Sequence, residues 1–584
     1  MDDEKTMLSR RLITLPILAA TLLVGCDDTS GTGDGTTGEA TTGGETLTTG
    51  PTTDPTTDPT TGPGSTSEAS STTGAESSST DESDSDAESS GDTTGPAHEC
   101  ELDEPGTCID EMTESVCEEV DGLRQWVDVA CGDEATCIAG GCASAIQQEF
   151  ITQLTTYLDG VQAGTAAAAD IDWADLHEQA AALVVAGDDS ADTLYRAARA
   201  LQLQIPQGHQ WVRFGPNQCG DPEGMPYTQQ TFYGACGRIS GDGVIVTVAD
   251  DANPLGLVAG DRIVGSNRWE EGENFLSQVA HEPMCSSLTP SNPNALRRQA
   301  AGDLLGLLDE GDTITVIDPD GDSREVEVPA RLADDPIGWC LNPIEGGYSN
   351  FEAQLTMRPD GIAVIRVPHF GPSETPFPNP LTAESYYQWV SDYVDRLAGV
   401  MSTIPADAPI IWDARSNSGG AAEVPLAIVA GMPGANRTQI SEGFQRILDT
   451  DPFEFTEDPI ATFSFEVPDD DRLNHNAPTA VLVDYSTTSA ADFFAWGAKE
   501  YSDAIVVGTP GTANYGYGGL GAVVVGGSVA ELAYRNDPLQ SRMMDGTPLE
   551  GVEVIPDVVV EYDPADLAGG VDTVLEAAVD ALLE

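Results

Sequence analysis

Lysine is nearly missing from this 584-residue chain, which holds only Lys5 and Lys499. In total, 24 basic residues stand against 98 acidic ones, which gives a formal net charge of -74. Nucleic acids and anionic lipid surfaces are bound through basic patches, so neither is expected as a partner. The scarcity of lysine also limits the chemistry of any serine nucleophile, because lysine is one of the bases that can activate it.

Signatures of bound cofactors are missing as well. The sequence contains no HExxH, P-loop or GxGxxG motif and no CxxC pair, so we predict no metal, nucleotide or other cofactor. After residue 24, no stretch approaches the roughly 18–20 consecutive apolar residues that a membrane-spanning helix needs.

The first 26 residues have the pattern of an export signal. Basic residues precede an apolar stretch at 12–24, which is too short for a mature spanning helix. This stretch ends in Leu-Val-Gly-Cys, which resembles a bacterial lipobox and implies cleavage before Cys26 and a diacylglycerol on its thiol. We therefore expect a protein anchored by lipid to the periplasmic face or the surface of a bacterial cell; a plain signal peptide with an incidental cysteine is the alternative.

The other ten cysteines fit an oxidising compartment outside the cytoplasm, where an even number predicts disulfides. Five bridges are expected, with a connectivity that the sequence leaves open. Six of these cysteines lie close together and four are scattered: Cys100, Cys108, Cys117, Cys131, Cys137 and Cys142, then Cys219, Cys236, Cys285 and Cys340.

Two segments separate the signal from the globular part. Residues 27–99 consist largely of Thr, Gly, Ser, Pro, Asp and Glu, a composition that predicts a disordered tether because it has too little apolar surface to bury. Residues 100–143 contain six cysteines and few apolar residues, and are expected to form a small disulfide module. The module is interpreted as a rigid spacer, with a binding role as the alternative.

From residue 145 onward the pattern becomes globular. Residues 145–230 are predicted as a helical subdomain, because apolar residues recur there at spacings of three and four. Residues 231–335 are dominated by strand-like runs, and residues 345–584 alternate strands with helices, which predicts an α/β layered core. The clearest predictions are a helix at 383–401, with Tyr387, Val390, Tyr393, Val394 and Leu397 on its apolar side, a helix at 490–500, and strands at 243–248, 312–317, 362–367, 409–412, 480–483 and 504–507.

Three sequence segments carry a family resemblance. The run Gly-Leu-Val-Ala-Gly-Asp-Arg-Ile within 256–265 resembles the turn of bacterial PDZ domains, which implies that 231–335 is PDZ-like. Residues 411–420 fit the D-x-R-x-N-x-G-G segment of tail-specific and tricorn-like serine peptidases. Residues 481–494 resemble the nucleophile segment of the same family, in which the catalytic serine falls on Ser489. A simple helix N-cap is the alternative role for Ser489.

The resemblance fails where tail-specific peptidases place their lysine base. Asn514 stands at that position, and an asparagine cannot accept a proton at neutral pH. Lys499 lies ten residues after Ser489 on one predicted helix, roughly 15 Å along its axis, which excludes a serine-lysine dyad unless the helix breaks. A histidine is therefore the expected base, as in the tricorn-like branch. His209 follows Gly208 in a segment that resembles the L-x-D-G-H-T stretch of that branch, and His369 is the runner-up.

The resemblance also implies the remaining site residues. Residues 545–557 resemble the family's G-x-P-x-E-G segment and place a catalytic carboxylate at Glu550, although Glu553 stands where glycine is usual. The backbone N–H groups of Gly419 or Gly420, together with that of Ala490, are expected to bind the oxyanion. The gly-gly pair as a plain turn and the 545–557 segment as a surface hairpin remain alternatives.

These observations predict an α/β protein with a crotonase-like layered catalytic core, an N-terminal helical subdomain and a PDZ-like β-rich domain, preceded by the tether and the disulfide module. The resemblance implies a serine peptidase that acts on peptides or unfolded proteins by acyl transfer, with an unknown oligomeric state. A catalytically inactive, lipid-anchored peptide-binding protein is the competing hypothesis, and an adhesion role of the cysteine module is compatible with both.

Overall fold

The computed structural model divides the chain into two units, one of which, residues 27–98, lies wholly outside the described residues. The structure describes residues 106–584 apart from 121–122, 133–134, 165–170, 206, 209, 215–232, 270–274, 281, 283–285, 290–292, 331–351, 372–381, 437, 448–453, 461–464, 513–521, 528–529 and 536–538. The predicted signal, Cys26, the tether, Cys100, Cys219, Cys285, Cys340, His209 and Asn514 therefore lie outside the described residues.

The cysteine-rich segment forms small β-structures linked by disulfides. One sheet contains β1 (Thr107–Asp110), β2 (Thr113–Val120) and β3 (Leu123–Ala130), and a second pairs β4 (Thr136–Ile138) with β5 (Gly141–Ala143). Disulfides join Cys108 to Cys137 and Cys131 to Cys142, and Cys117 and Cys236 are also disulfide-bonded. Gly141 of β5 packs against Val185, which ties the segment to the helices that follow.

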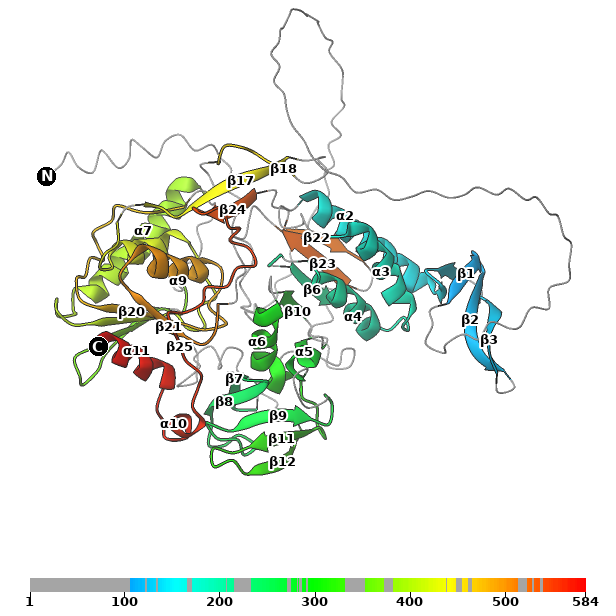
Figure 1. Cartoon of the computed structure of the whole chain (residues 1–584), viewed down its shortest axis with the longest axis horizontal. Helices are drawn as coiled ribbons and strands as arrows, with labels where there is room; N and C mark the ends of the chain where they lie inside the picture. Colours follow the sequence, from blue (N-terminus) through cyan, green and yellow to red (C-terminus); the bar gives the residue numbers. More distant parts are fainter. Residues whose placement is uncertain are drawn as a thin grey trace, which may run out of the picture. The chain divides into compact units, whose positions relative to one another are not determined.

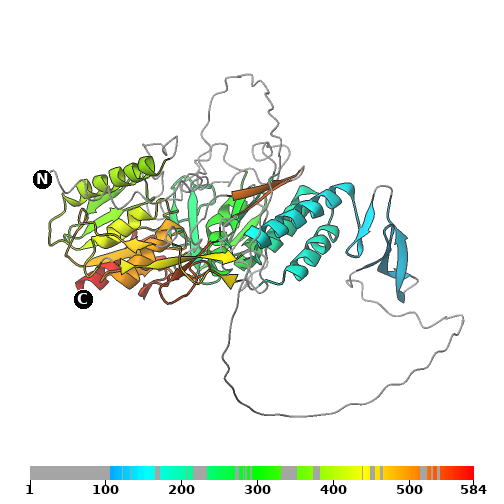
Figure 2. The same ribbon diagram turned by 90° about the horizontal axis from the view of Figure 1, so that it is seen from above.

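Three helices follow, and they pack on a sheet built from distant parts of the chain. Helices α2 (Ala145–Gly164) and α3 (Trp173–Val185) lie side by side in both views (Figures 1 and 2), and α4 (Ala191–Gln202) packs on α3. The predicted apolar residues are buried, as Phe150 and Leu194 show. The sheet has the order β10 (Ser286–Thr289), β6 (Gln210–Phe214), β23 (Ala530–Arg535), β22 (Ala522–Gly526). A segment that precedes the predicted nucleophile by about 275 residues is thus paired with one that follows it.

A five-stranded antiparallel sheet with two helices occupies most of the 231–335 region. Its order is β12 (Ser323–Glu327), β11 (Thr313–Ile317), β9 (Arg262–Ser266), β8 (Gly243–Ala249), β7 (Ala235–Ser240). Helices α5 (Phe275–Ala280) and α6 (Pro293–Asp303), with a 3-10 turn at Leu304–Leu307, bury their apolar sides against this sheet. The strands predicted at 243–248 and 312–317 are confirmed.

The C-terminal half is a three-layered α/β core. Its sheet has the order β13 (Gln354–Met357), β14 (Ala363–Arg366), β15 (Ile410–Asp413), β20 (Thr479–Val483), β21 (Ile505–Gly508), β25 (Val558–Val559), and only β13 is antiparallel to its neighbour. One face is covered by α7 (Ala383–Met401), α8 (Glu423–Ala430) and α9 (Ala490–Tyr501), and the other by α10 (Pro564–Ala568) and α11 (Thr573–Leu583). The mixed α/β class is thereby confirmed.

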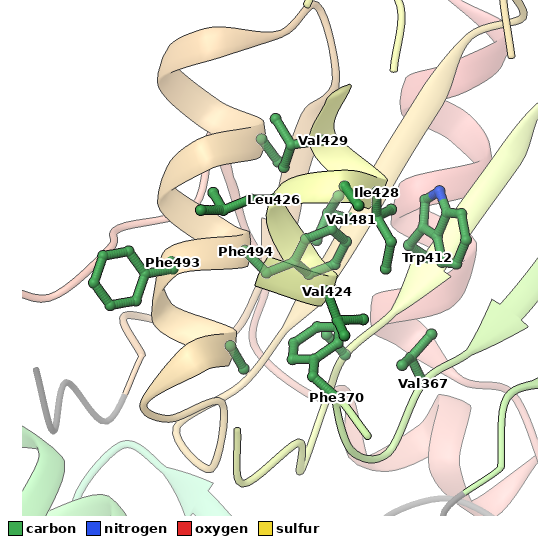
Figure 3. Packing of buried hydrophobic residues seen from close by; sticks show 14 of the residues in the cluster. Val367, Phe370, Trp412, Val424, Leu426, Ile428, Val429, Val481, Phe493 and Phe494 are labelled. Atoms are coloured by element: carbon green, nitrogen blue, oxygen red, sulfur yellow. The ribbon is translucent and has the colours of Figure 1, made fainter. Parts of the chain in front are cut away.

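Alternating strand residues supply the two cores of this sheet. Trp412 and Val481 point toward α8 and α9, where they meet Phe370 and Phe494 (Figure 3), whereas Ile411 packs toward α11. The predicted apolar side of 383–401 needs one correction. Its buried residues include Tyr393, but Tyr387 is 40% exposed, because the helix face that meets the core passes through Tyr386 and Trp389 instead.

Short strands complete the C-terminal half. β16 (Thr438–Gln439) pairs with β19 (Glu466–Val467), and β17 (Ser441–Ile447) pairs with β18 (Glu454–Phe455) and β24 (Leu539–Met543). Across the described ranges, no helix is long and apolar enough to cross a membrane.

Candidate active site

Ser489 lies between the end of β20 and the first residue of α9, in a backbone conformation that serine rarely adopts. Its φ is 57° and its ψ is -119°. Such strain persists only where the surroundings impose it, and it is typical of functional turns. The residue is half-buried, and its side chain makes no capping hydrogen bond to α9. Ser489 is thus the N-cap residue of α9 by position, but its hydroxyl does not cap the helix.

The Gly419-Gly420 pair lies directly against this serine. A side-chain carbon at Gly419 would come within 2.8 Å of Ser489 Cβ and 3.1 Å of the Ala490 nitrogen. The Gly419 N–H is donated to Asn417 Oδ1 at 2.8 Å, whereas within the described residues the N–H groups of Gly420 and Ala490 have no acceptor. Gly420 and Ala490 are thus the N–H groups available to an anion, and the second stands at the positive end of the α9 dipole.

Asn417 connects three segments around the serine. Its fully buried side chain donates from Nδ2 to the Val367 carbonyl at 2.7 Å, beyond the end of β14. The backbone carbonyl oxygen of Asn417 accepts a hydrogen bond from the N–H of Thr488 at 3.0 Å, and Thr488 directly precedes Ser489. The asparagine of the D-x-R-x-N-x-G-G segment therefore fixes the glycine pair relative to the nucleophile segment.

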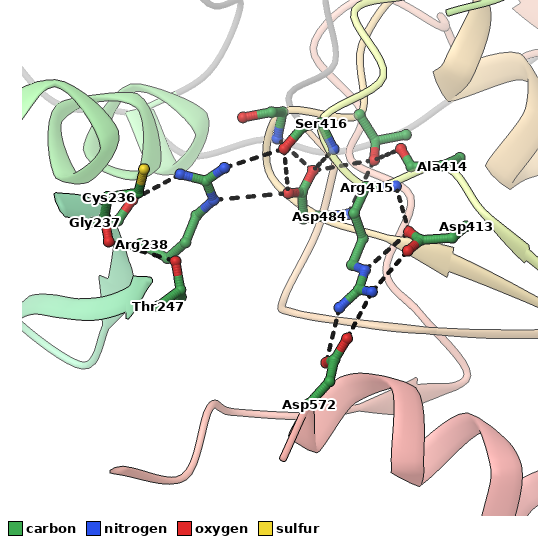
Figure 4. Close-up of polar contacts among 12 residues, drawn as sticks. Cys236, Gly237, Arg238, Thr247, Asp413, Ala414, Arg415, Ser416, Asp484 and Asp572 are labelled. Carbon is green, nitrogen blue, oxygen red and sulfur yellow. Dashed lines mark hydrogen bonds and ion pairs between the residues drawn. The ribbon is translucent and has the colours of Figure 1, made fainter. Parts of the chain in front are cut away.

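The aspartate and the arginine of the same segment form a buried ion pair (Figure 4). Arg415 contacts Asp413 through Nη2 at 2.7 Å and Asp572, the N-cap of α11, at 2.8 Å. Burial alone would raise the pKa of Asp413, but the Arg415 guanidinium outweighs burial and holds that pKa below its usual range. The charged groups of these two residues are thus engaged with each other and with Asp572.

A second buried cluster brings Arg238 from β7 into the catalytic core (Figure 4). Arg238 Nη2 donates to Ser416 Oγ at 3.1 Å, and its Nε lies 3.9 Å from Asp484 Oδ2. Asp484 is fully buried at the end of β20 and accepts the N–H groups of Ser416 at 2.8 Å and Ser486 at 3.0 Å. Sequence reasoning missed Arg238, because no local pattern connects positions 178 residues apart.

Replacing Arg238 by methionine is expected to lower the free energy of unfolding by about 3–5 kcal/mol, because the Asp484 carboxylate stays buried without its cation. Chemical denaturation at neutral pH measures this change. Arg297→Met is the matched control: Arg297 forms an exposed pair with Asp242 at 3.1 Å, and such pairs contribute about 1 kcal/mol or less. Equal losses in the two variants would contradict the structural role of Arg238.

Glu550 contacts the segment that carries the predicted base. Its Oε1 accepts the Gly208 N–H at 2.5 Å, and Gly208 directly precedes His209 in the sequence. His209 itself lies outside the described residues, so its role stays a prediction. The Glu550 carboxylate, which is half-buried and follows β24 in the chain, therefore lies at the start of β6. This contact argues against 545–557 being merely a surface hairpin.

Three other histidines are described, and they differ in their surroundings. His475 is buried with its Nε2 2.7 Å from the Ala408 carbonyl, and His177 lies 3.4 Å from Asp159 on the helices, so both have local structural partners. His369 also has a local contact, because its Nδ1 lies 3.5 Å from the Gly371 carbonyl oxygen. Its ring carbon Cε1 is 3.1 Å from the position that a Gly420 side-chain carbon would take. The runner-up base therefore lies beside the glycine pair.

The structure removes Lys499 from consideration as a base. Helix α9 is continuous, and in its last turn Lys499 Nζ donates to the Ile555 carbonyl and to Asp557, both at 2.8 Å.

The structure also explains Glu553, which stands where the family has glycine. Glu553 Oε2 accepts a hydrogen bond from Arg298 of α6 at 2.8 Å, so the departure joins this segment to the neighbouring domain.

Asp303, the last residue of α6, carries the clearest pH dependence near neutrality. Burial raises its pKa to about 7, against the opposing effects of Arg199, Gln299 and Arg238. Because the folded state then holds a proton that the unfolded state releases above about pH 4, stability falls as pH rises from 4 to 7.

Asp303→Asn is therefore expected to stabilise the fold at pH 8 by about 1–2 kcal/mol, and to have a much smaller effect at pH 4, where the folded state keeps the proton and the unfolded state is only about half ionised. A rise in the Asp303 pKa from about 4 to about 7 sets an upper limit of about 4 kcal/mol on this stabilisation, and the partial exposure of the residue reduces it. Urea denaturation at the two pH values is the measurement, with the exposed Asp407→Asn as control. A pH-independent effect would contradict the assignment.

The described residues hold no cluster of three or more His, Cys, Asp or Glu side chains able to bind a metal ion. A half-buried serine stands on a strand-to-helix turn, beside two backbone N–H groups that have no acceptor among the described residues. These features are the ones expected of a serine hydrolase site on an α/β core.

Comparison with known proteins relates part of the chain to one family. Residues 361–560, about a third of the chain, match the model of peptidase family S41. The resemblance to tail-specific and tricorn-like peptidases is thereby confirmed. Among the curated proteins, no relative matches the chain.

Two solved structures of mature CPAF, one complexed with lactacystin, share the fold. Each has a TM-score of 0.54 and 13% sequence identity and covers 75% of this chain, which in turn covers 98% of the lactacystin complex and 97% of the other. At this identity the likeness concerns the fold alone. It extends well beyond 361–560, so the segments outside the family match are also part of a shared architecture.

Proposed function

We propose that this chain is a serine peptidase of the bacterial cell envelope that cleaves peptides or unfolded proteins through a Ser489–His209 acyl-enzyme mechanism. The strained, half-exposed Ser489 beside the free Gly420 and Ala490 N–H groups carries this proposal. The match of 361–560 to a peptidase family supports peptides or proteins as substrates. The lipobox-like sequence supports anchoring through Cys26 and location at the periplasmic face or cell surface.

In the proposed mechanism, His209 takes the proton from Ser489 Oγ while this oxygen attacks the carbonyl carbon of the substrate peptide bond. The N–H groups of Gly420 and Ala490 stabilise the oxyanion. Removing one such donor typically raises the activation barrier by about 3–4 kcal/mol. The proton passes to the leaving amine, and water, activated by the same imidazole, then hydrolyses the acyl ester. Glu550 orients the segment of the base through the Gly208 N–H.

The finer fold assignments belong to the same proposal. The parallel strands β14, β15, β20 and β21 with helices on both faces support a crotonase-like core. The five-stranded sheet with α6 supports a PDZ-like domain. Its strand β7 sends Arg238 into the catalytic core, so this domain has a structural task beside any peptide binding.

The test is peptide cleavage by the purified protein with its disulfides formed, supplied with an unfolded protein and a mixed peptide pool. We expect cleavage by the parent and by His369→Ala, and none by His209→Ala. Cleavage lost in His369→Ala but kept in His209→Ala would transfer the role of base to His369. Capture of peptides without cleavage by any form would instead establish the catalytically inactive peptide-binding protein.

A further inference from the structure

A chain of buried polar side chains lies where the helical subdomain meets β6. Gln210, the first residue of β6, is completely buried, and so is Tyr157 of α2. The Tyr157 hydroxyl donates to Gln210 Oε1 and is hydrogen-bonded to Gln202 of α4. Polar groups in such an apolar cluster are stable only when they are hydrogen-bonded, so their geometry is fixed by one another. We call the first two residues the Tyr157–Gln210 clasp.

The clasp closes the turn that leads from α4 into β6. Gln210 Nε2 donates to the carbonyl of Ile205 at 3.1 Å and to that of Gln207 at 2.8 Å. The Gln207 N–H donates in turn to the Ile205 carbonyl at 2.7 Å. One amide side chain therefore holds two carbonyls of the turn, and Tyr157 fixes the orientation of that amide.

The same turn is held from the opposite side by the catalytic core. Glu550 Oε1 accepts the Gly208 N–H at 2.5 Å, and β6 pairs with β23, with Val212 opposite Leu532. Gly208 and Gln210 are the two sequence neighbours of His209. One is bound to the predicted catalytic carboxylate and the other to the helical subdomain.

We propose that Gln210 is a positioning residue for the general base, and that Tyr157 acts through it. The clasp sets the position of the 205–208 turn relative to Glu550, so the helical subdomain is a working part of the peptidase site. This inference rests on the proposed function of His209. It assigns a role to the glutamine that stands where the family's stretch has threonine.

The test compares the parent with Gln210→Met and with the double variant Tyr157→Phe/Gln210→Met. The double variant removes both groups of the Tyr157–Gln210 hydrogen bond, so the Tyr157 hydroxyl is not left beside an apolar side chain, and this guards against a single variant that does not fold. The Ile205 and Gln207 carbonyls lose their donor equally in both variants. After titration of active sites with a fluorophosphonate, we expect kcat to fall on the order of 10- to 100-fold, because a small misplacement of a catalytic group has effects of that size. KM should stay within threefold of the parent. Gln204→Met, at an exposed glutamine on the same segment, should leave both constants unchanged.

A second readout does not require peptidase activity. The rate at which diethyl pyrocarbonate modifies His209, mapped by mass spectrometry, should change at least fivefold in the double variant and remain unchanged in Gln204→Met. A folded double variant with the parent's kcat and modification rate would overturn the positioning role. If the parent cleaves nothing, the proposed function fails, whereas the modification rate still decides whether the clasp positions His209.

Discussion

Ser489→Ala is expected to lower kcat for peptide hydrolysis by a factor on the order of 10⁴–10⁶, with KM and thermal stability close to those of the parent. The hydroxyl is the atom that forms the acyl ester, and the remaining site retains only the stabilisation by backbone N–H groups and by substrate binding. Its side chain caps no helix, so its loss leaves the fold without an unsatisfied partner. Steady-state kinetics with a fluorogenic peptide, together with thermal unfolding, measure both quantities.

Two controls belong to this experiment. Ser486→Ala changes a serine on the same turn, and Lys499→Ala removes the one lysine of the C-terminal half, which is bound at the far end of α9. Both should retain activity within about threefold of the parent, since neither group reaches the reacting atoms. Activity that survives in Ser489→Ala, or that disappears in Lys499→Ala, would contradict the assignment of the nucleophile and its base.

Gly419→Ala is expected to reduce kcat by a factor on the order of 10²–10³. The new methyl group would come within 2.8 Å of Ser489 Cβ and 3.0 Å of the Thr488 carbonyl oxygen, so the nucleophile and the Ala490 N–H must shift together. Displacing an oxyanion donor has effects of this size. The φ of 104° adds a backbone penalty of about 1–3 kcal/mol to stability. Kinetics on active-site-titrated protein separate the catalytic loss from the stability loss.

Gly361→Ala isolates the backbone penalty. Its φ of 88° is similarly unfavourable for alanine, but a side-chain carbon there meets no atom within 4 Å. It should therefore be destabilised to a similar degree while each folded molecule keeps its full kcat. Similar kinetic losses in both variants would show that the close approach of Gly419 to Ser489 has no catalytic consequence.

Local patterns in the sequence were sufficient to predict the core elements. The helix predicted at 383–401 is α7, because its apolar residues recur at helical spacing and Tyr393 and Leu397 point into the core. The strand predicted at 480–483 lies within β20, whose residues are all buried between two helical layers. Such periodicity reports which faces are buried, but it gives no information on which distant segments meet.

Sequence motifs predicted which segments form the candidate site, but not the side-chain contacts within it. The segments around Gly419 and Ser489 lie together as expected, because both follow neighbouring parallel strands, β15 and β20, at the same edge of the sheet. That Asn417 engages the Gly419 N–H, which leaves Gly420 as donor, depends on side-chain geometry that no motif encodes. The Glu553–Arg298 pair joins residues 255 positions apart, so a departure from the family's glycine was visible in the sequence but its reason was not.

The most direct test of the Ser489–His209 site is covalent labelling of the purified parent with a fluorophosphonate, followed by mass spectrometry of the labelled peptide. We expect a single adduct on Ser489, formed rapidly by the parent and at least a hundredfold more slowly by His209→Ala, because the imidazole removes the proton as the oxygen attacks phosphorus. An adduct on another residue, or labelling of Ser489 at the same rate without His209, would contradict the Ser489–His209 peptidase site.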